Sequence, residues 1–140
     1  RYLTLYPQGS DAPKALLYLA DHARTAGRRD EASERYGALL DRFPHTAQSR
    51  KAFTRLGSAL LRAKRWSEAE SLFAPHMLSG TGSNAEVALV GMIRVRIAQG
   101  QRDTASRLIA RYRTRFPQGK RGAEVLRLNS ALSPTEQKNP

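Results

Sequence analysis

Two basic residues near the middle of this 140-residue chain have the spacing of a small anion-binding site. Lys51 and Arg55 are four positions apart, so on a helix their side chains extend from the same face. An ammonium and a guanidinium placed in this way can form charge-assisted hydrogen bonds with an acidic or carboxylate-terminated segment. The spacing predicts that such a segment binds here, although an ordinary solvated helix face carries the same kinds of residue and stays open as the alternative.

A second basic stripe lies further along the chain. Arg107, Arg111 and Arg115 follow the spacing i, i+4, i+8, and Asp103 has the spacing to pair with Arg107 alone. Such a stripe favours contacts with the phosphates of nucleic acid. No aromatic residues interleave with these arginines to stack on bases, so nucleic acid is the less favoured partner.

The residue types that perform catalysis are not arranged for it. The three histidines, His22, His45 and His76, fall in separate segments without the pairing that a metal ion requires. The glycines of 80–83 lack the Gly-Lys-Ser/Thr sequence with which a P-loop binds phosphate, so this segment is expected to be an insertion loop. No nucleophile, base or pair of carboxylates stands out. The sequence therefore predicts no metal ion, no cofactor and no enzymatic activity.

The elements that position these residues are marked by a recurring five-residue motif that contains an aromatic residue followed by proline. It occurs at Leu5–Gly9, Arg42–Thr46 and Arg115–Gly119. The first two copies are 37 residues apart and the last two 73, which is two periods with an eroded copy between them. A second landmark keeps the same register at Ala32, Ala69 and Ala105. A fixed period of this length indicates a stacked repeat, whose usual role is to hold a partner.

Between the landmarks, apolar residues recur with the 3.6-residue period of a helix, and no segment alternates as a strand does. The fold class is therefore all-α. Gly27 and Gly100 are suited to helix C-termini, Asp30 and Asp103 to the start of the following helix, and Ser67 to a capping box. Pro75 is expected to end or bend its helix early. Helices are predicted at about 12–26, 30–43, 46–63, 67–77, 84–99, 103–116 and 120–132.

These landmarks resemble the tetratricopeptide repeat over about residues 1–132. That family has small residues where its two helices cross, an aromatic residue in the second helix and a proline at the end of the unit. In this chain those positions hold Ala20 and Gly57, then Tyr36 and Phe73, then Pro44 and Pro117. The third unit departs most, with Ile93 and Arg96 where a small residue and a tyrosine are usual, and Ile109 at the aromatic position.

The resemblance implies a concave groove lined by the first helix of each pair. Lys51 and Arg55 match positions that hold a peptide's C-terminal carboxylate in the carboxylate-clamp subgroup of the family. Leu17 and Asp21 stand where that subgroup has Lys and Asn, which is a departure from it. The peptide-binding groove is expected to contain Lys14, Asp21, Lys51, Arg55, Arg62 and Arg94.

The repeat also implies the domain organisation. Three helix pairs at about 12–44, 46–83 and 84–117, with a closing helix at 120–132, would form one domain over 1–132, wound as a right-handed superhelix. Residues 133–140 are polar and are expected to be a flexible tail. Because the chain lacks an initiator methionine, we expect it to be a fragment of a longer repeat protein.

Composition narrows the kind of partner. Lys and Arg number 24 against 12 Asp and Glu, a net charge of +12 that favours acidic proteins, nucleic acid or anionic headgroups. There is no cysteine, and no apolar stretch is long enough to cross a membrane. Contact with a membrane surface would depend on an anchor in the parent protein.

The period of 36–37 residues with a Tyr/Phe-Pro close is most similar to the tetratricopeptide proteins of bacterial cell envelopes, of the BamD and CpoB type. That resemblance implies a protein- or peptide-binding scaffold, in the periplasm or at the outer membrane, that serves envelope assembly or coordination. One alternative is an intracellular, cytoplasmic adaptor or regulatory domain that contacts nucleic acid or acidic partners through the basic stripes. A third possibility is a spacer without a ligand within a longer solenoid.

Overall fold

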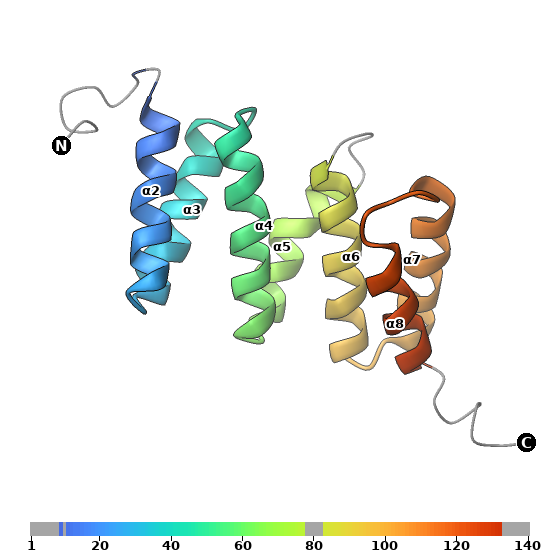
Figure 1. Ribbon diagram of the computed structural model, residues 1–140. Helices are drawn as coiled ribbons and strands as arrows, with labels where there is room; N and C mark the ends of the chain where they lie inside the picture. The colour runs from blue at the N-terminus through green and yellow to red at the C-terminus, as the bar shows by residue number, and fades with distance from the viewer. Residues whose placement is uncertain (1–8, 10, 78–82, 133–140) are drawn as a thin grey trace, which may run out of the picture. The chain divides into compact units, whose positions relative to one another are not determined.

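The structure is a computed structural model that describes residues 9, 11–77 and 83–132, and these residues are all in helices and the turns that join them (Figure 1). The helices are α2 (Ala12–Thr25), α3 (Arg29–Arg42), α4 (Ala47–Arg62), α5 (Trp66–Met77), α6 (Ser83–Ala98), α7 (Arg102–Arg115) and α8 (Gly122–Leu132). Each begins and ends within two residues of the bounds predicted from apolar spacing. The all-α prediction is confirmed, since the described residues form helices and no strand.

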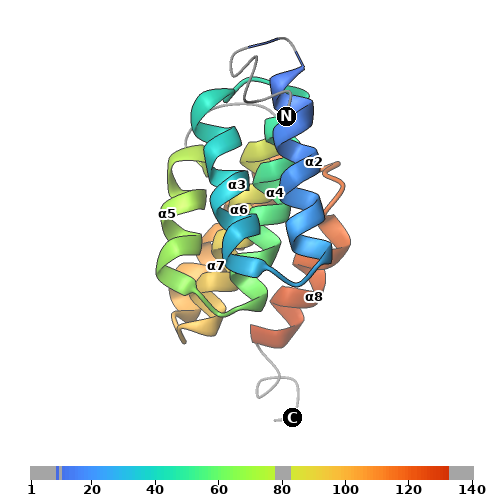
Figure 2. The same ribbon diagram turned by 90° about the vertical axis from the view of Figure 1, so that its left-hand side faces the viewer.

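The chain divides into two compact units, residues 1–59 and 60–140, with the boundary inside α4. In the first unit, α2 and α3 run antiparallel and pack side by side along their length (Figures 1 and 2). In the second unit, α6 packs against α5 on one side and α7 on the other. The last helix, α8, contacts both α7 and α6.

The single domain over 1–132 and the right-handed superhelix remain predictions, because each concerns how the two units are joined. Other expectations fall on segments outside the described residues. These are the first copy of the recurring five-residue motif within 5–9, apart from Gly9, the insertion loop at 80–82, and the tail at 133–140.

The first helix of each pair ends in the same turn, which explains the fixed period. At the first such turn, the Arg28 N–H donates to the Ala23 carbonyl at 2.9 Å, which together with Gly27 at φ +82° makes a Schellman motif. The matching turns lie 37 and 36 residues later, with Lys64 at φ +58° and Gly100 at φ +76° in the left-handed conformation. The turns at Gly27 and Gly100 were expected from glycine. The turn at Lys64 was not, because a residue with a Cβ rarely adopts this conformation.

These turns run directly into the next helices, so the helices start earlier than the capping residues suggested. Arg28 and Gln101 precede α3 and α7 without any side-chain cap, while Asp30 and Asp103 lie within the first turns, where a carboxylate still interacts favourably with the helix dipole. The capping box expected at Ser67 is wrong for the same reason, because α5 begins at Trp66. Pro75 lies inside α5, which continues to Met77.

The core is built where the small residues of the repeat allow helices to approach. Ala32, Ala69 and Ala105 are at most 4% exposed. In the second unit, the close approach of α6 to α5 depends on Gly91, since a Cβ there would overlap the ring of Phe73. The repeat pattern indicated a small residue at position 93 of the third pair, which holds the fully buried Ile93. The small residue is instead Gly91, two positions earlier.

Candidate partner-binding surface

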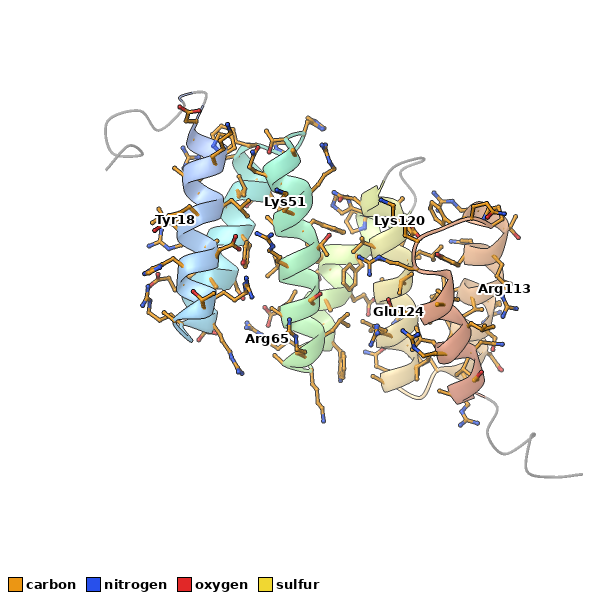
Figure 3. The ribbon with its side chains drawn as sticks, in the orientation of Figure 1. Tyr18, Lys51, Arg65, Arg113, Lys120 and Glu124 are labelled. Carbon is orange, nitrogen blue, oxygen red and sulfur yellow. The ribbon has the colours of Figure 1, made fainter. Side chains whose placement is uncertain are left out.

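Local sequence fixes the start of α4 and thereby the position of Lys51 and Arg55. The Thr46 hydroxyl accepts a hydrogen bond from the Ser49 N–H at 3.0 Å, which caps the helix. The Ser49 hydroxyl is fully buried and donates to backbone carbonyls of the preceding turn, with the Pro44 oxygen at 3.0 Å. Lys51 and Arg55 follow on the second and third turns of this anchored helix, and the exposed Lys51 is marked in Figure 3.

Arg55 is not an isolated cation. Its Nη1 donates to Asp21 Oδ2 at 2.5 Å, so that the pair joins α4 to α2 within the first unit. The two side chains are 36% and 30% exposed, which leaves the pair open to solvent. The structure therefore brings together two of the predicted groove residues, and it shows that Arg55 is placed to hold a carboxylate.

The other oxygen of Asp21 faces the core. The Tyr36 hydroxyl of α3 donates to Asp21 Oδ1 at 2.5 Å, and Arg24 Nε donates to the Tyr36 hydroxyl at 3.1 Å. Burial, and after it the hydrogen bond to Asp21, raises the pKa of the Tyr36 hydroxyl, so it remains a donor. Asp21 is thus held by a buried phenol on one side and a surface guanidinium on the other.

The remaining cations of this surface carry no such partner. Lys14 on α2 and Lys51 on α4 are exposed, and neither forms an ion pair with any residue in the described part of the chain. The α2–α4 surface, as we call Lys14, Asp21, Lys51 and Arg55, therefore has three positive groups and one negative group. Its excess of positive charge favours an anionic partner.

The other two predicted groove residues belong to the second unit. Arg62 is exposed in the last turn of α4. Arg94 of α6 donates through Nε to Glu124 Oε2 of α8 at 2.6 Å, and Glu124 is also 3.6 Å from Arg121. Figure 3 shows Glu124 on the helix beside α6. Arg94 thus ties α8 to α6, and its charge is neutralised by that contact.

The basic stripe of α7 is shorter than its spacing suggested. Arg107 and Arg111 are exposed, and Asp103 does not pair with Arg107. Arg115, by contrast, donates through Nη1 to the Met77 carbonyl at 2.7 Å and lies over the Phe116 ring at 5.1 Å. Since Met77 is the last residue of α5, Arg115 satisfies a helix C-terminus, which is a structural role.

A polar cluster in the second unit was missed by sequence reasoning. The Tyr112 hydroxyl donates to Glu86 Oε2 at 2.6 Å, and the Arg121 N–H donates to the same oxygen at 3.1 Å. Burial and this hydrogen bond raise the pKa of Tyr112 to about 12. A Cβ at Gly119 would overlap the Glu86 Oε2 and the Tyr112 hydroxyl oxygen. The glycine two residues after the closing proline was therefore the sequence feature that could have indicated this cluster. The cluster orders the turn before α8.

Two of the three histidines have distinct local environments. His22 stacks on the exposed ring of Tyr18, with ring centroids 6.2 Å apart, and burial lowers the pKa of His76. Across the ranges 11–77 and 83–132, no group of three His, Cys, Asp or Glu residues is placed to hold a metal ion. Within the same ranges, no helix has both the length and the apolar character of a membrane span.

Comparison with known proteins finds a match for the first helix pair. Residues 14–46 match the family model of the tetratricopeptide repeat, a span that runs from α2 through α3 to the turn before α4. Searches of curated proteins and of solved structures find no match. This match supports the repeat class expected from the landmarks, and repeats of this class generally mediate protein–protein interactions.

Proposed function

We propose that this chain is a non-catalytic scaffold whose α2–α4 surface binds an acidic segment of a partner protein. The observation that carries the proposal is the 2.5 Å contact of Arg55 with Asp21, because it supports Arg55 as a group that can hold a carboxylate at the surface. Lys51 lies one turn before Arg55 on the same face and has no acidic partner among the described residues. The repeat at 14–46 supports a protein as the partner.

The setting that we propose is the bacterial cell envelope, either the periplasm or the periplasmic side of the outer membrane. Support comes from the 36–37-residue period and the Tyr/Phe-Pro close of the units. In that setting the scaffold would recruit a partner during envelope assembly or coordination. A cytoplasmic location is the alternative.

A second candidate function is contact with nucleic acid through α7. It is favoured by the exposure of Arg107 and Arg111 one turn apart, which suits two phosphate contacts. It ranks second because Arg115, the third member of the stripe, is engaged with Met77.

Titration of a fluorescein-labelled peptide rich in glutamate, followed by anisotropy, tests the first function. Replacing Lys51 and Arg55 together with alanine should weaken binding at least about tenfold and flatten its dependence on salt, since two charge-assisted contacts are lost. The matched control is Arg107→Ala with Arg111→Ala, which removes the same charge elsewhere.

Equal weakening by both double variants would show that the peptide responds only to net charge. It would rule out the α2–α4 surface as the specific binding site. A labelled single-stranded oligonucleotide bound by the wild type and released by the α7 variant would instead support the second function.

A further inference from the structure

We propose that Asp21 is a built-in competitor for the ligand, so that the α2–α4 surface selects segments with two or more adjacent carboxylates and rejects a single one. This inference rests on the proposed function, since it concerns which acidic segments that surface accepts. It makes Asp21 a specificity-determining residue of the scaffold.

The Asp21–Arg55 contact has the properties of an exchangeable pair. It links two side chains that are each about a third exposed, at 36% and 30%. Ion pairs open to solvent contribute little net stability, so replacing Asp21 by an incoming carboxylate costs the fold little. A ligand can therefore reach Arg55 without opening the core.

The displaced carboxylate would not be left without a donor. Its other oxygen still accepts from the Tyr36 hydroxyl at 2.5 Å, and Arg24 Nε, which donates to that hydroxyl at 3.1 Å, keeps the tyrosine in place. Tyr36 itself is fully buried and fixed by packing. Asp21 thus has a stable alternative state, and exchange does not create an unsatisfied buried acid.

A ligand with one carboxylate gains little from this exchange. It replaces one carboxylate on Arg55 by another, so the number of charge-assisted hydrogen bonds stays the same while the ligand loses freedom. A second carboxylate next to the first meets Lys51, which is exposed one turn away and pairs with no described residue. Net binding therefore requires at least two acidic groups.

The repeat itself does not require an acid at this position. The residues in the same register are Ser58 in the second pair and Arg94 in the third. Helix packing is thus compatible with a neutral or a positive side chain there. The buried Tyr36 hydroxyl, which Phe73 and Ile109 lack in the other pairs, needs an acceptor at this position but does not need a charged one.

The experiment compares two labelled peptides of equal length with amidated C-termini, one with two adjacent glutamates and one with a single glutamate, on the full 140-residue chain. The wild type should bind the two-glutamate peptide at least about tenfold more tightly than the other. Asp21→Asn keeps an acceptor for Tyr36 but removes the competing charge, and should raise affinity for the single-glutamate peptide about tenfold. Asp21→Ser, which copies the second pair, serves the same purpose if the first variant does not fold.

The matched control is Glu31→Gln, which removes one negative charge from α3 of the same unit, where Glu31 pairs with Arg28 and Arg35. It should leave both affinities unchanged. If Glu31→Gln improves binding as much as Asp21→Asn does, the effect is that of net charge and the inference is overturned.

Two other outcomes separate this inference from the function on which it rests. Wild-type binding of both peptides with equal affinity, or no gain from Asp21→Asn, overturns the competitor role and leaves the acidic-segment scaffold intact. Absence of binding to either peptide by the wild type and by both Asp21 variants overturns both proposals.

Discussion

At the scale of single residues, Lys64 carries the clearest local cost. It occupies the left-handed conformation, φ +58°, in the turn where the other two repeats have Gly27 and Gly100. A side chain in this region is strained by contact between Cβ and the backbone, whereas glycine is not. The Lys64 N–H and the Arg65 N–H still close the turn, at 3.1 and 2.9 Å, so the hydrogen bonds of the motif offset the strain.

Lys64→Gly should therefore stabilise the fold by about 1 kcal/mol, because the strain is relieved and the turn keeps its hydrogen bonds. Urea denaturation followed by circular dichroism measures the change. Gly100→Ala is the reverse experiment and should cost a similar amount, since it introduces a Cβ at φ +76°. Loss of stability in Lys64→Gly would mean that the lysine stem makes contacts that outweigh its strain.

Tyr112 should make the stability depend on pH in the alkaline range. Its pKa is raised to about 12 in the folded state from its ordinary value of 10.0, so the folded state favours the protonated phenol. The contribution is fully present below pH 10.0, the unfolded value, and is lost as the pH rises toward about 12. The pKa of Tyr36 is also raised, so its contribution to stability is likewise lost at alkaline pH.

Replacing Tyr112 with phenylalanine isolates this contribution from that of Tyr36. The difference in unfolding free energy between wild type and variant should be constant below pH 10.0 and shrink above it. Chemical denaturation at several pH values provides the test. A difference that stays constant up to about pH 12 would show that the Glu86 hydrogen bond does not hold the phenol proton.

At the scale of elements, the approach of one helix to another depends on small residues at particular points. Gly91 of α6 lies against the Phe73 ring of α5, where a Cβ has no room. Gly37 of α3 is also a helical glycine, yet nothing lies within 4 Å of the Cβ it would carry. The same substitution should therefore have opposite effects at the two positions.

Gly91→Ala should destabilise the protein by about 1–3 kcal/mol, because the helices must separate or the ring must turn away. Gly37→Ala should stabilise it by about 0.5–1 kcal/mol, since alanine is the better helix former and meets no neighbour. Thermal melting of the two variants beside the wild type measures both. A shift of the same sign in both would contradict the packing of α5 on α6.

The same packing argument applies to the alanines that mark the repeat. Ala69 has no exposed surface, so Ala69→Leu should overpack its surroundings and cost about 1–3 kcal/mol. Ala110, an exposed residue of α7, is the control, and leucine there should change the melting temperature little. An unchanged melting temperature in the Ala69 variant would show that the repeat register is misassigned.

Much of this element-level structure could be predicted from the sequence, because periodic features determine it. Apolar spacing located every described helix, and Gly27 and Gly100 marked two of the turns. Lys64 was missed since lysine carries no signal for the left-handed conformation. The Asp21–Arg55 contact, which defines the candidate site, joins residues 34 apart and depends on how α2 and α4 pack, which spacing along one helix does not contain.

At the scale of the whole molecule, the acidic side chains are largely used within the chain. Those with a partner in the structure include Asp21, Glu31, Glu68, Glu70, Glu86 and Glu124. The net charge of +12 is thus spread over cations such as Lys14, Lys51, Arg107 and Arg111 that point to solvent. Their mutual repulsion opposes the compact state and is screened by salt.

Stability should accordingly rise with ionic strength. Increasing sodium chloride from about 10 to about 200 mM shortens the screening length from about 30 Å to less than 10 Å, which weakens long-range repulsion more than the close pairs. The melting temperature should increase over this range. A decrease would mean that the internal ion pairs, such as Arg65 with Glu68 at 2.7 Å, outweigh the repulsion.

The ion pairs that join consecutive first helices have opposite polarity, and this bears on how such an array can change by duplication. In the first unit, the acid Asp21 is on the earlier helix and the base Arg55 on the later one. In the second unit, the base Arg94 comes first and the acid Glu124 follows. A rearranged chain that placed α8 directly after α2 would set Asp21 beside Glu124, two like charges. The charges of these pairs therefore favour one order of the helices. A chain with the helices in another order would lack the ion pair at that contact and would have repulsion between two carboxylates instead.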